Sequence, residues 1–276
     1  MSIVSPRAAE YFSYVPVHGL PEVMIGLFLS LGIILVVQIL NTSAPKWMYV
    51  LTGAAVGEAL GYIMRVVCTY RPHLGLFIVM DLFLLLPPNA LALFNYMCVR
   101  EVTKRTKKQN VAIYLRPSFI SWVYNTSDIV GFVLQMVGCG MEPPRATRHA
   151  GQIVVLIGLG IQLLFLGAFL VTVMYVWKDP EMTVVRAPGD QTQEVAKRRL
   201  MQVLTVTTLL LYVRLVYRIV NYASGFGGAI YRSEWALYTF DSLMVLVCFI
   251  IYVVRFVGHY FPADGRTAEE VVLRSA

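Results

Sequence analysis

Charged residues are scarce in this chain. Asp, Glu, Lys and Arg make up 14% of its 276 residues, whereas they make up about 25% of an average soluble domain. Hydrophobic residues account for 58%, and the mean hydropathy is +0.66. A core of ordinary size cannot bury so much apolar surface. The composition therefore excludes a soluble globular protein and indicates a polytopic membrane protein.

Cysteine is also rare, and the known cysteine motifs are missing. The four cysteines lie in or at the ends of apolar stretches, without Cys-x-x-Cys spacing, at Cys68, Cys98, Cys139 and Cys248. We interpret them as small buried side chains rather than as a disulfide or metal framework. The phosphate-binding loop of ATP-driven proteins is absent as well. Uphill transport by this chain would therefore need a proton gradient or a partner.

Seven apolar stretches have the length of a helix that crosses a bilayer, about 20 residues. They lie at residues 21–40, 47–68, 74–98, 118–140, 151–177, 200–222 and 235–259. The sequence thus predicts an all-α membrane protein with a seven-transmembrane helix bundle at residues 21–261. An N-terminal segment at 1–20 precedes the bundle, and a short tail at 262–276 follows it.

The positions of Lys and Arg predict the orientation, because these residues are retained on the cytoplasmic side near span ends. Five fall on one side of the spans, and fourteen fall on the other. The fourteen are Lys46, Arg100, Lys104, Arg105, Lys107, Lys108, Arg116, Lys178, Arg186, Lys197, Arg198, Arg199, Arg266 and Arg274. We therefore predict an N-terminus outside and a cytoplasmic C-terminus. The net charge of +7 becomes a topology signal, and we expect no nucleic-acid partner.

Ionisable residues also occur inside the predicted spans, where each costs about 2.5–3.5 kcal/mol if it faces lipid at mid-depth. Their spacing places them on single helical faces, in the pairs Glu58 with Arg65, Asp128 with Gln135, Arg214 with Arg218, and Glu234 with Asp241. Most of these groups, with Asp81 and Gln162, fall in the middle or outer half of the bundle. The inner half is expected to be nearly apolar apart from Arg255.

Two interpretations of these buried charges are open. We predict that they form a polar, water-accessible cavity that opens to the outside. Alternatively, they only pair with one another and fix how the helices pack, since buried ion pairs often add little net stability. Intramembrane charge more often marks a functional site, and this favours the cavity.

Small residues and prolines predict how the helices pack. Gly53, Gly57 and Gly61 form a ridge along the second span that permits close approach of a neighbouring helix. Pro87 and Pro88 fall in the middle of the third span, where missing amide donors and ring clashes produce a kink. We expect this kink to open a cavity or to act as a hinge.

The order of these motifs resembles a known family. The motifs are Glu58-x2-Gly61-Tyr62-x2-Arg65, Pro88 followed by Tyr96 and Arg100, Asp128-x6-Gln135-x2-Gly138-x-Gly140, Gly158-Leu159-x2-Gln162, and Arg214-x3-Arg218 followed by Gly225, Gly228, Glu234, Tyr238 and Asp241. Over the second to seventh spans, the chain resembles the fungal lipid-translocating exporter family (RTA-like), which is named for resistance to aminocholesterol. Two positions depart from the family pattern. Asn221 replaces a usual Glu, and His259 is followed by Pro262 rather than directly by proline.

The resemblance implies seven helices with the N-terminus outside, in a fungal plasma or internal membrane, and of the two we expect the plasma membrane. It also implies roles in moving or resisting amphipathic molecules such as sphingoid bases, sterol amines and porphyrins. The predicted substrate-binding residues are Glu58, Tyr62, Arg65, Asp128, Gln135, Gln162, Arg214, Arg218, Glu234, Tyr238 and Asp241. An amine headgroup would meet the acids and a phosphate or carboxylate the arginines, while the tail stays against apolar helix faces.

The favoured function is therefore a flippase-like transporter or exporter that is not an enzyme. Its partners would be membrane lipids and an amphipathic small molecule, and the sequence makes no prediction of oligomeric state. A seven-helix lipid receptor or sensor is the alternative, although its usual Asp/Glu-Arg-Tyr and Asn-Pro-x2-Tyr motifs are absent. A zinc hydrolase is disfavoured because His18, His73, His149 and His259 cannot converge. No cofactor or metal is predicted, and haem or porphyrin remains a possible ligand.

Overall fold

The computed structural model describes residues 19–71, 73–104, 116–141, 147–179, 192–225 and 233–261. Seven long helical segments make up these residues, and none of the described residues forms a strand. The segments are α2 (Leu20–Thr42), α3 (Tyr49–Tyr70), α4 (Leu74–Thr103), α5 (Pro117–Met141), α6 (Arg148–Lys178), α7 (Gln193–Ala223), and the continuous run of α8 (Glu234–Leu237), η3 (Tyr238–Ser242) and α9 (Leu243–Val254). The single turns η1 (Lys46–Met48) and η4 (Val257–Tyr260) flank α3 and α9. The predicted all-α class is confirmed.

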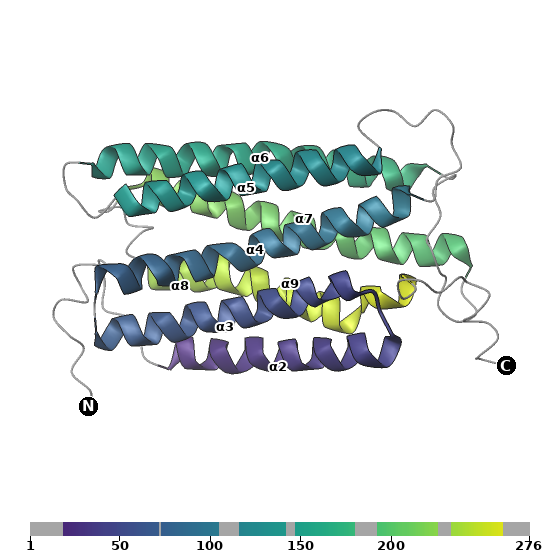
Figure 1. The fold of residues 1–276 in the computed structure, drawn as a ribbon, viewed down its shortest axis with the longest axis horizontal. Coiled ribbons are helices and arrows are strands. Elements are labelled where there is room, and N and C mark those ends of the chain that lie inside the picture. The colour runs from purple at the N-terminus through teal and green to yellow at the C-terminus, as the bar shows by residue number, and fades with distance from the viewer. Residues whose placement is uncertain are drawn as a thin grey trace.

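The helices run side by side along the length of one bundle (Figure 1). From α2 to α7, each helix packs against the next in the chain, and α9 closes the ring by packing against both α7 and α2. Helix α4 also contacts α6 and α7. Polar side chains on α4 can therefore meet groups from several other helices.

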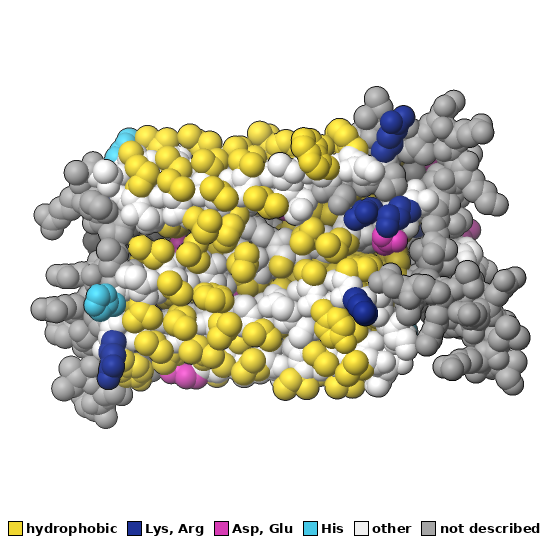
Figure 2. Space-filling model, in the orientation of Figure 1, with side chains coloured by type: hydrophobic (Ala, Val, Ile, Leu, Met, Phe, Trp, Pro, Cys, Tyr) yellow, Lys and Arg dark blue, Asp and Glu magenta, His cyan; other side chains and the backbone are white. Residues whose placement is uncertain are grey.

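The surface of the bundle is suited to lipid. Large hydrophobic side chains are exposed along it, among them Leu164 at 75% and Val171 at 70%. Figure 2 shows such side chains over the middle of one face, with Lys and Arg toward its ends. Six of the seven segments are long and apolar enough to cross a membrane. The protein is therefore an integral, multi-pass membrane protein.

Helix α5 is long enough to cross a membrane, but it is not among the segments whose hydropathy indicates a span. It is 25 residues long, which corresponds to about 37 Å of helix at 1.5 Å per residue. Its N-terminal half carries Asn125, Thr126, Ser127 and Asp128, and it packs along α6. Its polar residues explain its lower hydropathy, and we retain it as the fourth span.

The helix boundaries differ from the predicted spans by five residues or more at three ends, and one of them is the end of α4, at Thr103 instead of residue 98. Helix α7 begins at Gln193 rather than near residue 200, because a helix continues its backbone hydrogen bonds beyond the apolar layer through polar residues. The last span ends at Val254 instead of residue 259. There Arg255 leaves the helical conformation, with φ −114° and ψ 59°, and its side chain is exposed. The predicted orientation in the membrane remains a prediction.

Two of the three glycines of the predicted ridge on α3 lie against α4. A Cβ added at Gly57 would lie 3.1 Å from the ring of Pro87, and one at Gly61 would lie 2.7 Å from the side chain of Leu84. Both glycines therefore permit the close contact between α3 and α4. The prediction for Gly53 was wrong: a Cβ there would meet nothing within 4 Å, because this residue lies on the exposed face of α3.

The two prolines lie inside α4 without ending it. Pro88 cannot donate a hydrogen bond to the carbonyl four residues earlier, which belongs to Leu84. Nη2 of Arg214 on α7 donates to this carbonyl instead, over 3.1 Å. A side chain of a neighbouring helix thus satisfies the backbone group that the proline leaves without its usual partner.

Helices α5 and α6 make the closest contact described in the bundle at a second set of glycines. A Cβ at Gly138 would lie 2.5 Å from Cγ2 of Val155 and 2.7 Å from the carbonyl oxygen of Gly151. A Cβ at Gly158 would lie 2.7 Å from the carbonyl oxygen of Gly131. At these points the backbones of α5 and α6 are in contact, so a residue larger than glycine would overlap backbone atoms of the neighbouring helix.

We predict that Gly138→Ala destabilises the protein, because the new methyl group overlaps backbone atoms that cannot move away. Overpacking of this kind costs about 1–3 kcal/mol. Thermal unfolding of the detergent-purified protein measures the effect. Gly140→Ala is the matched control, since a Cβ there meets nothing within 4 Å. Equal melting temperatures for the two variants would contradict the packing described here.

Candidate functional site

Asp241 is the centre of a buried ion-pair cluster. Arg218 of α7 donates to both carboxylate oxygens of Asp241, from Nε over 3.1 Å and from Nη2 over 2.7 Å. Nε of Arg214, one turn earlier on α7, lies 2.7 Å from Oδ1 of the same carboxylate. Arg218 also lies 3.7 Å from Asp81 of α4. One carboxylate thus joins two guanidinium groups, and Arg218 extends the cluster to α4.

A second ion pair extends this cluster toward the end where α3 ends and α8 begins. Nη2 of Arg65 on α3 donates to Glu234 on α8 over 3.1 Å. The guanidinium of Arg65 also lies 5.5 Å from the ring centroid of Tyr238, within the range of a cation–π contact. Tyr62, on the same helix, donates a hydrogen bond to Ser242. The sequence-predicted residues of α3 and the last span are therefore in direct contact.

A turn of π-helix at Tyr238–Ser242 positions these groups. Such a turn inserts an extra residue into the helix, and π-turns occur often at functional sites. Tyr238, Asp241 and Ser242 are all buried within it. The irregular turn therefore directs the carboxylate of Asp241 and two hydroxyl-bearing side chains into the bundle together.

Glu58 differs from the other acids of the cluster. Its side chain is 3% exposed, and the charges of Arg214, Asp241 and Arg218 all act on it. Among the described residues, however, it makes no ion pair within 4 Å. Across the residues that the structure describes, the cluster contains four carboxyl groups, at Glu58, Asp81, Glu234 and Asp241, and three guanidinium groups, at Arg65, Arg214 and Arg218. One carboxyl group is therefore in excess.

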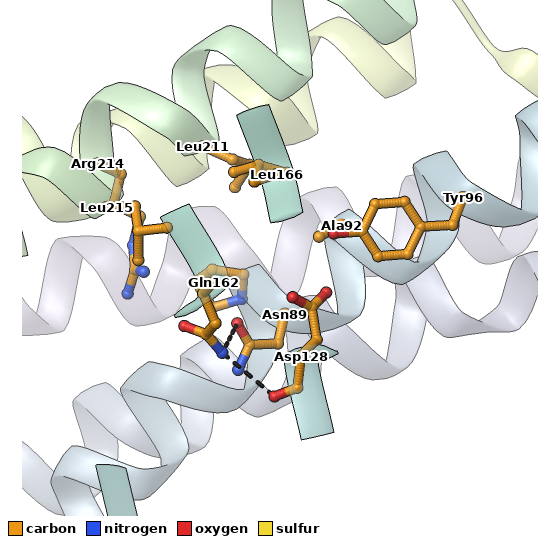
Figure 3. A pocket seen from close by; sticks show the side chains of 10 residues that line it. Asn89, Ala92, Tyr96, Asp128, Gln162, Leu166, Leu211, Arg214 and Leu215 are labelled. Atoms are coloured by element: carbon orange, nitrogen blue, oxygen red, sulfur yellow. Dashed lines mark hydrogen bonds between the residues drawn. The ribbon is translucent and has the colours of Figure 1, made fainter. Parts of the chain in front are cut away.

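A small cavity lies beside the cluster, between α4, α5, α6 and α7 (Figure 3). Its volume is about 20 Å³, which is room for about one water molecule. Pro88, which cannot donate a backbone hydrogen bond within α4, is one of the residues that line it. Its other lining residues are Asn89, Ala92, Tyr96, Asp128, Gln162, Leu166, Leu211, Arg214 and Leu215.

Amide side chains join the walls of this cavity. Nε2 of Gln135 donates to Oε1 of Gln162 over 2.7 Å. Nε2 of Gln162 in turn faces the carbonyl oxygen of Asp128, at 3.3 Å, and Oδ1 of Asn89, at 3.4 Å. Gln162 of α6 is thus hydrogen-bonded to both α5 and α4, as the dashed lines in Figure 3 show.

The predicted residues therefore form two adjoining groups, and Arg214 belongs to both. The prediction of an open, water-accessible cavity was wrong for this structure. Arg65, Asp128, Gln135, Gln162, Arg214, Arg218 and Asp241 are all less than 10% exposed. Most of them bond to one another across helices that pack directly together, and the cavity described beside them holds about one water molecule.

A further polar group was not predicted from the sequence, because the inner half of the bundle was expected to be almost entirely apolar. Nδ2 of Asn95 on α4 donates to the hydroxyls of Thr207 and Thr208 on α7, over 3.2 and 3.1 Å. The hydroxyl of Tyr252 on α9 donates to Oδ1 of Asn95 over 2.9 Å. An asparagine between apolar residues near the end of the third span was the available signal. Tyr96, the next residue, was likewise not predicted to line a site.

The fold and these buried charges define a seven-helix membrane protein with an ion-pair cluster inside its bundle. The chain belongs to the RTA1-like family, whose model, described as RTA1 like protein, matches residues 51–264. This match confirms the resemblance drawn from the motifs. No solved structure matches the chain.

Among the relatives of the chain are three proteins from Saccharomyces cerevisiae. The chain is 28% identical over 203 residues to the uncharacterized membrane protein YLR046C, covering 72% of each chain. It is 27% identical over 184 residues to protein RTA1, covering 65% of this chain and 56% of RTA1. It is 25% identical over 209 residues to protoporphyrin uptake protein 1, covering 74% of this chain and 67% of that relative.

We predict that Asp241→Asn greatly reduces the yield of folded protein. The substitution removes the counter-charge of two buried arginines, and breaking a buried pair costs about 3–5 kcal/mol. Fluorescence-detected size-exclusion chromatography and thermal unfolding measure this loss. Glu101→Gln is the control, because Glu101 and its partner Lys104 are 28% and 43% exposed and exposed pairs contribute about 0–1 kcal/mol. A folded, equally stable Asp241→Asn variant would show that the cluster is not needed for folding.

Proposed function

We propose that this protein is a flippase-like exporter of amphipathic lipids or lipid-like toxic compounds. The observation that carries this proposal is the buried cluster, in which, within the described part of the chain, carboxyl groups outnumber guanidinium groups by one. Intramembrane charge that only held helices together would have no need for an unmatched carboxyl group, which is costly in lipid. A substrate headgroup of positive charge can neutralise the excess.

The excess of acid favours amine headgroups over phosphates, so sphingoid bases and sterol amines fit best. Glu58 is the group that would receive the amine, because Asp241 already accepts hydrogen bonds from Arg218 and lies against Arg214. Porphyrins carry carboxylates and would instead need the arginines to leave their present partners. The apolar faces of the helices suit the tail of such a substrate.

The relatives support a role in transport or resistance without identifying a substrate. One of them is named protoporphyrin uptake protein 1, and the name describes that protein alone. The chain spans 56% of the length of RTA1. That this chain shares the activity of the full-length relative is therefore part of the proposal. We further propose the plasma membrane as its location, since export from there would lower the intracellular concentration of a toxic amphiphile.

Transport requires the bundle to open. The cavity of about 20 Å³ holds about one water molecule, which is far less than an amine headgroup with its attached chain. The structure is therefore a closed form. Separation of α5 and α6 from α4 and α7 would enlarge the cavity, because its lining residues come from these four helices.

We predict that Glu58→Gln abolishes resistance to a toxic sphingoid base when the protein is produced in a sensitive fungal host. The amide keeps the size of the side chain but cannot neutralise an amine. In liposomes, leaflet-to-leaflet transfer of a fluorescent sphingoid base should fall at least tenfold. Glu101→Gln serves as the matched control at an exposed site, and membrane levels of all variants are compared.

The same assay separates transport from sensing. Saturable binding of the fluorescent base without transfer by the wild-type protein would favour the seven-helix lipid sensor. Wild-type resistance and transfer in a well-expressed Glu58→Gln variant would exclude Glu58 as the headgroup site.

A further inference from the structure

Asp128 is a buried carboxyl group without a cation beside it. Its side chain is 8% exposed, and it makes no ion pair within 4 Å among the described residues. Its Oδ2 atom has no hydrogen-bond partner, and the carboxyl group faces the cavity (Figure 3). Asp241, by contrast, is paired with two arginines. The two acids therefore differ in what neutralises them.

The groups around Asp128 are mostly uncharged. From α4, the Tyr96 hydroxyl points toward the carboxyl group and interacts with it, and this hydroxyl has no other hydrogen-bond partner. From α6, the polar group that faces the cavity is the amide of Gln162. From α7, Arg214 lines another part of the cavity, where its guanidinium is engaged with Asp241 and the Leu84 carbonyl. On α5 itself, the Tyr124 hydroxyl is hydrogen-bonded to Thr172.

A buried ionised carboxyl group without a counter-charge is strongly unfavourable in a medium of low dielectric constant. A proton removes this cost with no change of shape. A metal cation suits the site less well, because the cavity is also lined by Arg214 and by an Asn89 amide nitrogen that has no acceptor. Protonation of Asp241 would instead oppose its pairs with Arg214 and Arg218, so Asp128 is the better proton acceptor of the two.

We propose that Asp128 is the proton-binding site of this protein and couples the inward passage of a proton to the outward passage of a cationic amphiphile. The inference rests on the proposed function. A proton from water on the outer side forms an O–H bond at Oδ2 in one conformation, and that bond breaks when the proton leaves to the cytoplasmic side in the other. One positive charge then moves in for each ammonium headgroup that moves out, so the exchange is electroneutral.

Infrared difference spectroscopy of the purified protein tests the proton site without any substrate. Between acidic and alkaline buffer, the wild-type protein should show a band of a protonated carboxyl group. The band should be lost in Asp128→Asn, shifted in frequency in Asp128→Glu, and unchanged in the control Glu101→Gln. The frequency shift in Asp128→Glu assigns the band even if Asp128→Asn does not fold. A band that is unaltered in both Asp128 variants, or no band in the wild type, would overturn the proposal.

Proteoliposomes with the fluorescent sphingoid base test the coupling. An imposed pH gradient should make the wild-type protein concentrate the base at least tenfold on the acidic side, and Asp128→Asn should lose this response. Asp128→Glu should restore part of it. Wild-type transfer that ignores the gradient would overturn the coupling and leave the proposed exporter intact. If the wild type transfers nothing while the band still depends on Asp128, the proton site is supported and the exporter proposal fails.

Discussion

The arrangement of the bundle depends on the need to neutralise charge in a medium where water is absent. Arg214 and Arg218 lie one turn apart on α7, and both meet the same carboxylate of Asp241. Two buried guanidinium groups need a counter-charge, and Asp241 of the last span supplies it. The last span must therefore pack beside α7. Arg218 also approaches α4 through Asp81. Hydrophobic packing allows helices to slide, whereas these directional contacts fix their register.

The sequence predicted the spans well because crossing a bilayer imposes a length and a hydropathy on each helix. It also predicted which residues face inward, because spacing along one helix defines a face. It did not predict which of these residues form ion pairs with one another. Glu58 and Arg65 share a face of α3, yet Arg65 pairs with Glu234 of α8. Which residues pair depends on how neighbouring helices are rotated and how deep they lie in the membrane. The spacing of residues along one helix gives no information on either.

Other features were missed because their signal is weak in an apolar sequence. Asn95 bonds to α7 and α9, but one amide among leucines and phenylalanines shows no periodicity. Gly138 matters because the backbone of α6 approaches it, whereas Gly53 belongs to a regular small-residue pattern but a Cβ there would meet nothing within 4 Å. The expectation of an open cavity failed for a related reason. The number of polar groups says nothing about whether they bond to water or to one another.

The bond from Arg214 to the Leu84 carbonyl determines which parts of the bundle can move separately. The same side chain pairs with Asp241, so a rotation of α7 would break its contacts to α4 and to the last span at once. These three segments are thus constrained to move as one body, with α3 held to α4 through Gly57 and Gly61. Helices α5 and α6, joined at Gly131, Gly138 and Gly158, form a second body. The cavity with Asp128 lies at the seam between the two bodies, where a relative tilt would change its size first.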